Sequence, residues 1–543
     1  MDMDAFTRSY LWVFVSVLWV IGALLPDVLA APPGTIKGLD DQIVGQAVVI
    51  GGKQLFIDDY IVEQLQGARK VLNQPTKDPR NPLVVRDKPW EGYAIAHGSV
   101  VHDANESLYK LWYTVWQGTL EEEKKGTSMA RTAYASSPDG ITWEKPVFNE
   151  EEKSAIVTFT PPLPYACVGS VLIEPSEKDP NRRYKMLVLG MADGTSKTLG
   201  IFAAYSADGL HWEQEPTNPV ASWGDGPPCT YWDAPRQRYV AHTRWWPPNT
   251  RKIAQIESED FVHWSPKVMV VDHHGNLDKP FRSAFQMMAA QPYEGVYIGL
   301  LTVHHGETLK PIPEDKPWTD KINVQLTYSR NGITWQRVGP EGAIPAGQQH
   351  TDAQWQRLAE QAPFLPYGDH KSKDWDWGWT NSFEPPLLVM GDEIRIYYLG
   401  VPAVHWWNYH GELPEGETPA YAYGLATLRL DGFVSVEAGQ AEGTLTTKPL
   451  VFTGDALEVN ANASGGEMRV EAIDLQGNAI EGFSQVDCKP IRTDSVRHVL
   501  QWNGSEDANL LQALPIRLKF YLQNAKLYSF TPRILHNHFQ PNE

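Results

Sequence analysis

The sequence is poor in cysteine. Three cysteines in a chain of 543 residues are too few for a scaffold held together by disulfides. Cys167 and Cys229 open corresponding strands of two successive sequence repeats, so they could lie close together. Buried free thiols are favoured over a disulfide between them, and Cys488 is left over in either case.

Basic residues are also scarce, and no block of them stands out. There are 47 lysines and arginines against 66 aspartates and glutamates, which gives a formal net charge of −19. An acidic surface repels phosphate backbones, so nucleic acid is not expected as a partner. No glycine-rich phosphate loop follows a strand pattern, so no nucleotide or redox cofactor is expected either.

Long apolar runs are absent from the sequence except at the N-terminus. Arg8 precedes an apolar stretch over residues 10–25, which Pro26 interrupts, and the small side chain of Ala30 follows. This layout predicts a secretory signal peptide over residues 1–30, and hence a secreted or periplasmic protein with no membrane span in the mature chain. A retained membrane anchor is the alternative, although the run is shorter than the roughly 20 residues that a span needs.

A short phrase recurs along the chain. Its four copies begin with serine and end with tryptophan, at residues 137–143, 206–212, 258–264 and 329–335. A looser fifth copy lies at residues 429–433. The four tryptophans are 69, 52 and 71 residues apart, which fits one β-sheet blade with its loops in each repeat.

Each phrase predicts a tight hairpin turn between two strands. Asp-Gly or Asn-Gly, as at Asp139-Gly140, supplies the positive φ angles that such turns need. The tryptophan then opens the next strand and is expected to pack between neighbouring sheets. Regular short strands separated by such turns are typical of a propeller.

We therefore predict an all-β protein made of a five-bladed β-propeller and a C-terminal β-sandwich. The propeller is expected over residues 95–440. Residues 31–94 form a lead, in which a strand at about 55–62 partly closes the propeller. Apolar and polar residues alternate over residues 441–535, which predicts the antiparallel sandwich.

Together, the repeat phrases and the sandwich resemble the five-bladed propeller glycoside hydrolases, the superfamily of families 32, 43, 68, 117 and 130. The stretches around Asn81-Pro82-Leu83 and Trp90-Glu91 also look like the lead-in of such proteins. The resemblance implies a glycosidase whose carboxylates project from the innermost strands into an axial funnel. Glycoside hydrolysis needs one carboxylic acid to protonate the leaving oxygen and a second carboxylate as nucleophile or base.

Few acidic residues stand at the starts of the predicted inner strands. Glu384 is the expected general acid, because its neighbours Phe383 and Pro385 would desolvate the carboxyl and favour its neutral form. Asp225 or Glu91 is the expected base or nucleophile. Glu384 and Asp225 also have structural alternatives. These are an ion pair at the rim for Glu384 and a turn for Asp225.

Two other acidic positions fit the chemistry less well. Asp233 comes late in its strand, before a hairpin, and is expected to form the turn. Asp58 and Asp59 look like the nucleophile motif of family 32, but the Asn-Asp-Pro-Asn core of that motif is absent. Asp59 is kept as a substrate-binding candidate, with a structural ion pair as the alternative.

Histidine replaces an acid at one expected position. Families 43 and 32 place an aspartate at the start of the first inner strand, where this sequence has His97. Family 117 is similar in using a histidine as an acid in such a funnel, so His97 is expected to orient substrate or donate a proton. His242 is a substrate-binding candidate. A hydrogen-bonded core histidine is the alternative for both.

Aromatic residues favour a sugar ligand. The chain has 21 tryptophans and 22 tyrosines, and aromatic faces stack on sugar rings as well as filling cores. Substrate contact is expected from four residues of the loops and strand ends: Arg244, Trp245, Trp379 and Trp406.

The expected function is an exported glycoside hydrolase acting on a poly- or oligosaccharide. A noncatalytic carbohydrate-binding propeller is the alternative. A sialidase is less favoured, because its similar repeat phrase carries an extra residue and its fold has six blades. The sequence shows no ligand cluster that demands a metal, although the resemblance leaves room for Ca²⁺ in the funnel.

Overall fold

The computed structural model describes residues 47–119, 122, 129–174, 177–222, 226–245, 251–273, 278, 283–306, 319–344, 363–405, 418–512 and 514–535. These residues form two compact units. Unit 2 is Leu72–Phe433, and unit 1 combines the chain before Leu72 with the chain after Phe433. Regular structure in the described residues is almost all β-strand, so the all-β prediction is confirmed. No described helix has the length and apolar character needed to cross a membrane.

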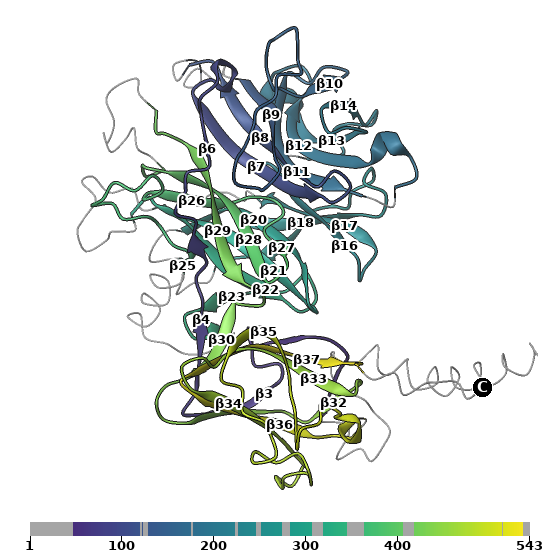
Figure 1. The fold of residues 1–543 in the computed structure, drawn as a ribbon. Helices are drawn as coiled ribbons and strands as arrows, with labels where there is room; N and C mark the ends of the chain where they lie inside the picture. Colours follow the sequence, from purple (N-terminus) through teal and green to yellow (C-terminus); the bar gives the residue numbers. More distant parts are fainter. Residues whose placement is uncertain are drawn as a thin grey trace, which may run out of the picture. The chain divides into compact units, whose positions relative to one another are not determined.

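Unit 2 consists of successive antiparallel meanders, which we number 1 to 5 along the chain (Figure 1). In each, the first three strands pair in chain order. Their bounds are β7 (Ala94–Asp103), β8 (Leu108–Gln117) and β9 (Met129–Ser137); β11 (Tyr165–Ile173), β12 (Tyr184–Met191) and β13 (Leu199–Ser206); β16 (Cys229–Asp233), β17 (Arg238–Trp245) and β18 (Lys252–Ser258); β20 (Ser283–Tyr293), β21 (Val296–His305) and β22 (Ile322–Ser329); and β26 (Trp379–Ser382), β28 (Glu393–Val401) and β29 (Ala422–Arg429).

Shorter strands extend the edges of these meanders. Meander 2 is widened by β14 (His211–Gln214), β10 (Thr158–Thr160) and β15 (Ala221–Ser222), and meander 3 by β19 (Val268–Val271). Meander 4 gains β23 (Trp335–Gly339), β24 (Gly342–Ala343) and β25 (Pro363–Leu365), and meander 5 gains β27 (Leu388–Met390).

The repeat phrases form the turns that the sequence predicts. In the second copy, Asp208 accepts hydrogen bonds from the backbone N–H groups of Leu210 and His211 at 2.8 and 2.9 Å, and Ser206 accepts one from Gly209 N–H at 2.8 Å. Gly209 has φ 80°, a conformation that glycine adopts without strain. The other copies repeat this pattern around Asp139, Asp260 and Asn331.

The tryptophans of the phrases pack between meanders, as predicted. Trp143 lies edge-on to Tyr397 of β28, with ring centroids 5.9 Å apart. Trp212 lies edge-on to Trp112 of β8 at 6.4 Å. Trp335 packs against buried residues of meander 3.

Hydrophobic contacts and one strand pairing link the meanders into a closed cycle. Separate apolar clusters join meander 1 to meander 2, meander 2 to meander 3, and meander 3 to meander 4. Meanders 4 and 5 are joined by the pairing of β22 with β26. A further cluster joins meander 5 back to meander 1, through residues such as Tyr397 and Leu111.

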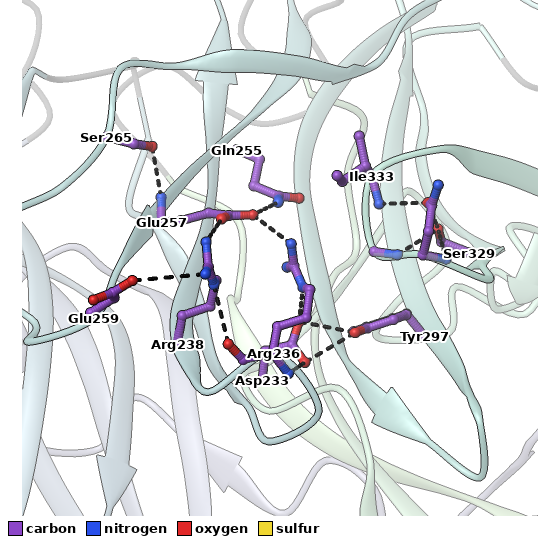
Figure 2. Close-up of polar contacts among 12 residues, drawn as sticks. Asp233, Arg236, Arg238, Gln255, Glu257, Glu259, Ser265, Tyr297, Ser329 and Ile333 are labelled. Atoms are coloured by element: carbon purple, nitrogen blue, oxygen red, sulfur yellow. Dashed lines mark hydrogen bonds and ion pairs between the residues drawn. The ribbon is translucent and has the colours of Figure 1, made fainter. Parts of the chain in front are cut away.

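A buried network of polar residues ties meander 3 to meander 4 (Figure 2). The hydroxyl of Tyr297 lies 3.0 Å from each carboxyl oxygen of Asp233, which is fully buried at the end of β16. Arg236, in the following hairpin, pairs with the same carboxylate at 2.5 Å and with Glu257 at 2.7 Å. Asp233 therefore organises a hairpin, in agreement with its predicted role as a turn former.

The same arrangement recurs between earlier meanders. A tyrosine near the start of a second strand donates to an acid that ends, or directly follows, the first strand of the meander before it. Tyr184 donates to Asp103 at 2.6 Å, and Tyr239 donates to Glu174 at 2.5 Å. These contacts hold neighbouring meanders together at the end where the first strand of a meander finishes.

One predicted boundary is corrected by the strand pairing. The strand expected at 55–62 to close the propeller belongs to unit 1, where β2 (Gln54–Leu55) pairs with β37 (Ala525–Arg533) and β3 (Val62–Gln66) pairs with β31 (Gly443–Thr447). The strands that extend meander 5 are instead β5 (Thr76–Lys77) and β6 (Val84–Val85), which both pair with β29. The residues between the two predicted domains also shift, because unit 2 ends at Phe433.

Unit 1 has two main antiparallel sheets around one core. The first contains β30 (Val434–Ala438), β33 (Ala456–Asn462), β35 (Asp494–Val499), β37 and β4 (Arg69–Leu72), and the second contains β3, β31, β34 (Glu467–Ile473) and β36 (Arg517–Gln523). A small parallel pair is formed by β1 (Val48–Ile50) and β32 (Leu450–Phe452). Val459 of the first sheet and Phe520 of the second belong to the same buried cluster.

Candidate active site

The first strands of meanders 5, 1, 2 and 3 are linked side by side. Backbone N–H groups of one strand donate to backbone or serine oxygens of its neighbour. These bonds run from Glu384 to the Gly98 carbonyl (3.1 Å), from Val100 to the Glu384 carbonyl (2.7 Å), from Val171 to the Ser99 hydroxyl (2.9 Å) and from Thr230 to the Ser170 hydroxyl (2.6 Å). Glu384 therefore lies among the first strands of the meanders.

The first strands of meanders 1, 2 and 4 each carry an irregularity in their pairing with the second strand. The pairing register shifts at His97 in β7, at Gly169 in β11 and at Gln286 in β20. A β-bulge redirects a side chain and breaks regular pairing, and bulges are common beside active sites. His97 is thus presented by a bulge next to Gly98, whose carbonyl accepts a hydrogen bond from Glu384 N–H.

Glu384 is buried without a hydrogen-bonding partner for its carboxyl group. It is 1% exposed, and within the described residues neither carboxyl oxygen makes a hydrogen bond of normal geometry. The Cys229 thiol lies close enough to affect it, but its contact does not meet that geometry. Burial raises the pKa of Glu384 well above its ordinary range, and the Cys229 thiol opposes this only in part. The carboxyl is therefore held in its neutral form.

His97 is neutral for the same reason. Burial, and then the positive charge of Arg244, lower the pKa of His97 to about 3. Its Nδ1 atom is buried and has no partner in the part of the chain that is described. A neutral imidazole can both donate and accept a hydrogen bond, so His97 can orient a hydroxyl group of a ligand.

Arg244 provides a positive charge near these groups. Its Nε donates to the carbonyl of Gln286, at the bulge of β20. A Cβ atom at Gly226 would lie 2.8 Å from the guanidinium carbon, so the backbone of Gly226 lies close to the Arg244 side chain. The charge of Arg244 lowers the pKa of His97, Cys229 and His405. Trp245, the next residue, is 36% exposed.

Glu91 does not share this environment. It is fully buried and pairs with Lys145 at 2.6 Å. Its carboxylate also accepts the Tyr113 hydroxyl at 2.9 Å and the backbone N–H groups of Asp87 and Lys88, each at 2.8 Å. These contacts give Glu91 a structural explanation, and none of them brings it to Glu384. Its expected role as base or nucleophile stays a prediction.

His242 and Asp59 also have structural explanations. His242 is buried between meanders 3 and 4, where its ring contacts Trp335 at 5.5 Å and its Nε2 lies 3.2 Å from Gln255. Burial lowers the pKa of His242 to about 4. Asp59 belongs to unit 1, where it pairs with Lys70 at 2.7 Å. Neither residue is brought to Glu384 by any contact within the described chain.

The remaining candidates divide into two groups. Asp225 and Trp406 lie outside the described residues. Trp379 begins β26, and its ring lies 5.4 Å from that of His405 and 6.1 Å from that of Tyr421. Trp379 is therefore placed at the start of the first strand of meander 5.

The three cysteines are free and buried, as predicted. Burial raises the pKa of Cys167 to about 11 and raises the pKa of Cys229 well above its ordinary range. The negative charge of Glu384, when present, would raise the pKa of Cys229 further. Both thiols are thus unreactive neutral groups within the core.

A cluster of two histidines and one aspartate was not predicted from the sequence. His304 Nε2 lies 2.7 Å from Asp320 Oδ1, and the rings of His304 and His405 are 4.5 Å apart. One potential ligand atom from each residue lies within 4.8 Å of the others. Burial and the charge of Arg251 lower the pKa of His304 to about 3, and burial lowers that of His405 well below its ordinary value.

An open surface pocket lies at the other end of meander 3. Its volume is ≈ 440 Å³, and it is lined by Arg238, Glu257, Ser258, Glu259, Asp260, His263, Trp264 and Ser265. Cys229 pairs with His242 at one end of the β16–β17 hairpin, whereas Arg238 pairs with Asp233 at the opposite end. No residue predicted for the site lines this pocket.

The chain is similar to solved structures of several carbohydrate-acting proteins. A GH32 β-fructofuranosidase of Bombyx mori has 13% identity, covers 84% of this chain and 95% of its own, and gives a TM-score of 0.38. A thermostable family-43 glycoside hydrolase has 14% identity, with 63% and 93% covered and a TM-score of 0.37. An N-acetylgalactosamine deacetylase from F. plautii has 14% identity, with 70% and 96% covered and a TM-score of 0.40.

Two of these structures come from families 32 and 43, which the repeat phrases also resemble. No family model matches the chain, and no curated protein matches it. Likeness at this level assigns no residue a role, so the site is described from its own contacts.

Proposed function

We propose that unit 2 is a five-bladed β-propeller and that unit 1 is a β-sandwich. The closed cycle of contacts supports the propeller, because a ring of sheets is completed only when the last packs on the first. The single core shared by both sheets of unit 1 supports the sandwich. In this arrangement, meanders 1 to 5 are the blades and their first strands line the axis.

We further propose that the propeller cleaves glycosidic bonds with Glu384 as the general acid. The observation that carries this proposal is the neutral, buried carboxyl of Glu384 without a hydrogen-bonding partner among the described residues. An unpartnered buried polar group costs about 1–3 kcal/mol, so its presence at the centre of the ring calls for a use. A general acid must carry its proton at the working pH, which burial ensures here.

The second carboxylate is proposed to be Asp225. Its support is its position in the sequence, because it precedes Cys229 by only a few residues in a Gly-Asp-Gly-Pro-Pro stretch, and Cys229 neighbours Glu384. Glu91 is the weaker candidate, because Lys145 and Tyr113 already contact its carboxylate.

Sugar contact is proposed to come from His97, Arg244 and two aromatic residues. Trp245 is partly exposed beside Arg244, and Trp379 borders the start of the fifth inner strand. Aromatic rings stack on the apolar face of a sugar, and a neutral His97 can hydrogen-bond its hydroxyl groups. The chain is also proposed to be exported through the predicted signal peptide, which N-terminal sequencing of the mature protein would test.

A screen of purified protein against poly- and oligosaccharides would test this function. Once a substrate is found, Glu384→Gln should slow turnover by roughly 10² to 10⁴, while substrate binding persists. Glu259→Gln is the matched control, because Glu259 is an exposed acid at the other end of meander 3. Equal turnover by wild type and Glu384→Gln would overturn the assignment. Binding of a glycan without cleavage would favour the noncatalytic propeller.

A further inference from the structure

Two imidazoles and one carboxylate converge where meanders 4 and 5 adjoin. His304 lies in β21, Asp320 precedes β22, and His405 follows β28. The pairing of β22 with β26, and of β26 with β28, brings these distant segments together. Asp320 is fully buried and His304 is 5% exposed, whereas His405 is partly buried.

The backbone holds the three residues in place. Asp320 N–H donates to the carbonyl of His305 at 2.9 Å, and His405 N–H donates to the carbonyl of Asp320 at 2.9 Å. Asp320 has φ 58°, a left-handed conformation that aspartate and asparagine tolerate better than most residues. The cluster is therefore anchored independently of its side-chain contacts, as a preorganised binding site requires.

We propose that His304, Asp320 and His405 bind one divalent transition-metal ion, such as Zn²⁺. Imidazole nitrogen suits zinc, copper, iron and nickel, whereas Ca²⁺ takes oxygen ligands. The approach of potential ligand atoms to within 4.8 Å of one another lets a single ion reach all three after small side-chain adjustments. Three protein ligands leave at least one coordination position for water or a ligand oxygen.

Simple histidine–aspartate hydrogen bonds elsewhere in unit 2 provide a comparison. His211 lies 2.8 Å from Asp208, and His263 lies 2.7 Å from Asp260, but both histidines are exposed. Neither pair has a third potential ligand among the described residues. The third ligand, His405, and the burial of His304 and Asp320 distinguish the proposed site from these surface pairs.

The proposed metal site lies at the same end of the meanders as Glu384. Ser283, the first residue of β20, pairs with His305, so the cluster stands where an inner strand begins. An open coordination position there would bind a hydroxyl oxygen of a ligand. The metal site itself does not depend on the proposed glycosidase activity.

Zinc binding by the full-length protein tests the proposal without a substrate. The protein is stripped with a chelator, dialysed against ZnCl₂ and desalted, and its metal content is measured. Wild type should retain about one zinc per chain, and zinc should raise its thermal midpoint because only the folded state has the site. Asp320→Asn keeps the shape and the backbone conformation but should weaken zinc binding by more than about 100-fold, since loss of even an outer-shell partner costs 10–100-fold.

His405→Gln should give the same loss, and it covers the case in which the buried Asp320→Asn variant fails to fold. His211→Gln is the matched control, because it removes an exposed histidine paired with an aspartate at nearly the same distance. This control should bind zinc like wild type. The proposal is overturned if wild type retains well under one zinc per chain, or if Asp320→Asn and His405→Gln bind zinc as tightly as wild type.

Discussion

The hydroxyl of Tyr184 donates to Asp103 at 2.6 Å across the boundary between meanders 1 and 2. Lys110 and Arg183 pair with the same buried carboxylate at 3.3 and 2.6 Å. Burial opposes the charge of Asp103, but the hydrogen bond from Tyr184 and the two cations outweigh it and lower its pKa to about 2. The carboxylate thus stays charged although it is buried, and it links two meanders.

Replacing Tyr184 by phenylalanine should lower the free energy of unfolding by about 1–3 kcal/mol, because it removes one donor from a buried carboxylate. Urea denaturation at pH 7 measures the loss. Tyr109→Phe is the control, since the Tyr109 hydroxyl contacts Arg395, which also pairs with Glu393 and the Asp139 carbonyl. Its loss should be smaller, and a larger loss for Tyr109→Phe would contradict the role given to Tyr184.

Glu384→Gln should gain stability relative to wild type as the pH rises. The folded state raises the pKa of Glu384 above its ordinary value of 4.5, so the folded chain keeps a proton that the unfolded chain loses. The stability of wild type therefore decreases as the pH rises from about 4.5 toward the folded pKa. Thermal midpoints of wild type and Glu384→Gln between pH 4 and 9 measure this, with Glu259→Gln as an exposed control. A pH-independent difference would show that Glu384 ionises normally.

Glu91→Gln should reduce stability without directly removing chemistry. It leaves the cation of Lys145 without its closest partner in a buried setting, which costs up to about 3 kcal/mol, the low end for breaking a buried ion pair. The hydrogen bonds from Tyr113 and the backbone can persist with the amide. Denaturation and turnover per folded molecule separate the two effects. A loss of turnover like that of Glu384→Gln, with unchanged stability, would restore Glu91 as a catalytic candidate.

Gly209→Ala tests the turn in the second repeat phrase. Glycine there has φ 80°, and a Cβ atom would lie 2.6 Å from Cζ2 of the buried Trp112. The backbone conformation alone should cost about 1–2 kcal/mol, and the clash another 1–3 kcal/mol. Gly295→Ala is matched in φ but meets no atom within 4 Å, so it should show only the first cost. Equal losses for the two variants would rule out the contact with Trp112.

The thiols offer a test that needs no variant. All three cysteines are free and buried, and burial raises the pKa of Cys167 to about 11. A thiol reagent at pH 8 should label none of them in the folded protein and all three in denaturant. Rapid labelling of Cys229 in the folded state would show that the region around Glu384 is open to solvent.

Local sequence patterns predicted the features that depend on local contacts. Asp208 accepts hydrogen bonds from residues two and three positions ahead, so its turn could be read from the phrase itself. The apolar neighbours of Glu384 predict a desolvated carboxyl, and its burial agrees with that prediction. The free thiols were likewise expected from their number alone.

Features that depend on distant partners could not be predicted in this way. The role of Glu91 is set by Lys145, 54 residues away, and no motif links the two positions. The cluster of His304, Asp320 and His405 is assembled by strand pairing across meanders 4 and 5, so its spacing in the sequence carries no signal. The segment at 55–62 is apolar around two acids, and only the pairing of β2 and β3 shows which unit it joins.

The connection between the two units has a consequence for synthesis of the chain. The two ends of unit 2 lie side by side, because Asn73 N–H donates to the carbonyl of Phe433 at 2.9 Å. The strands directly before and after unit 2, β4 and β30, share one sheet of unit 1. Unit 2 is thus an insertion within unit 1. A ribosome makes all of unit 2 before it makes β30 to β37, so the meanders can begin to fold while the first strands of unit 1 still lack their partners.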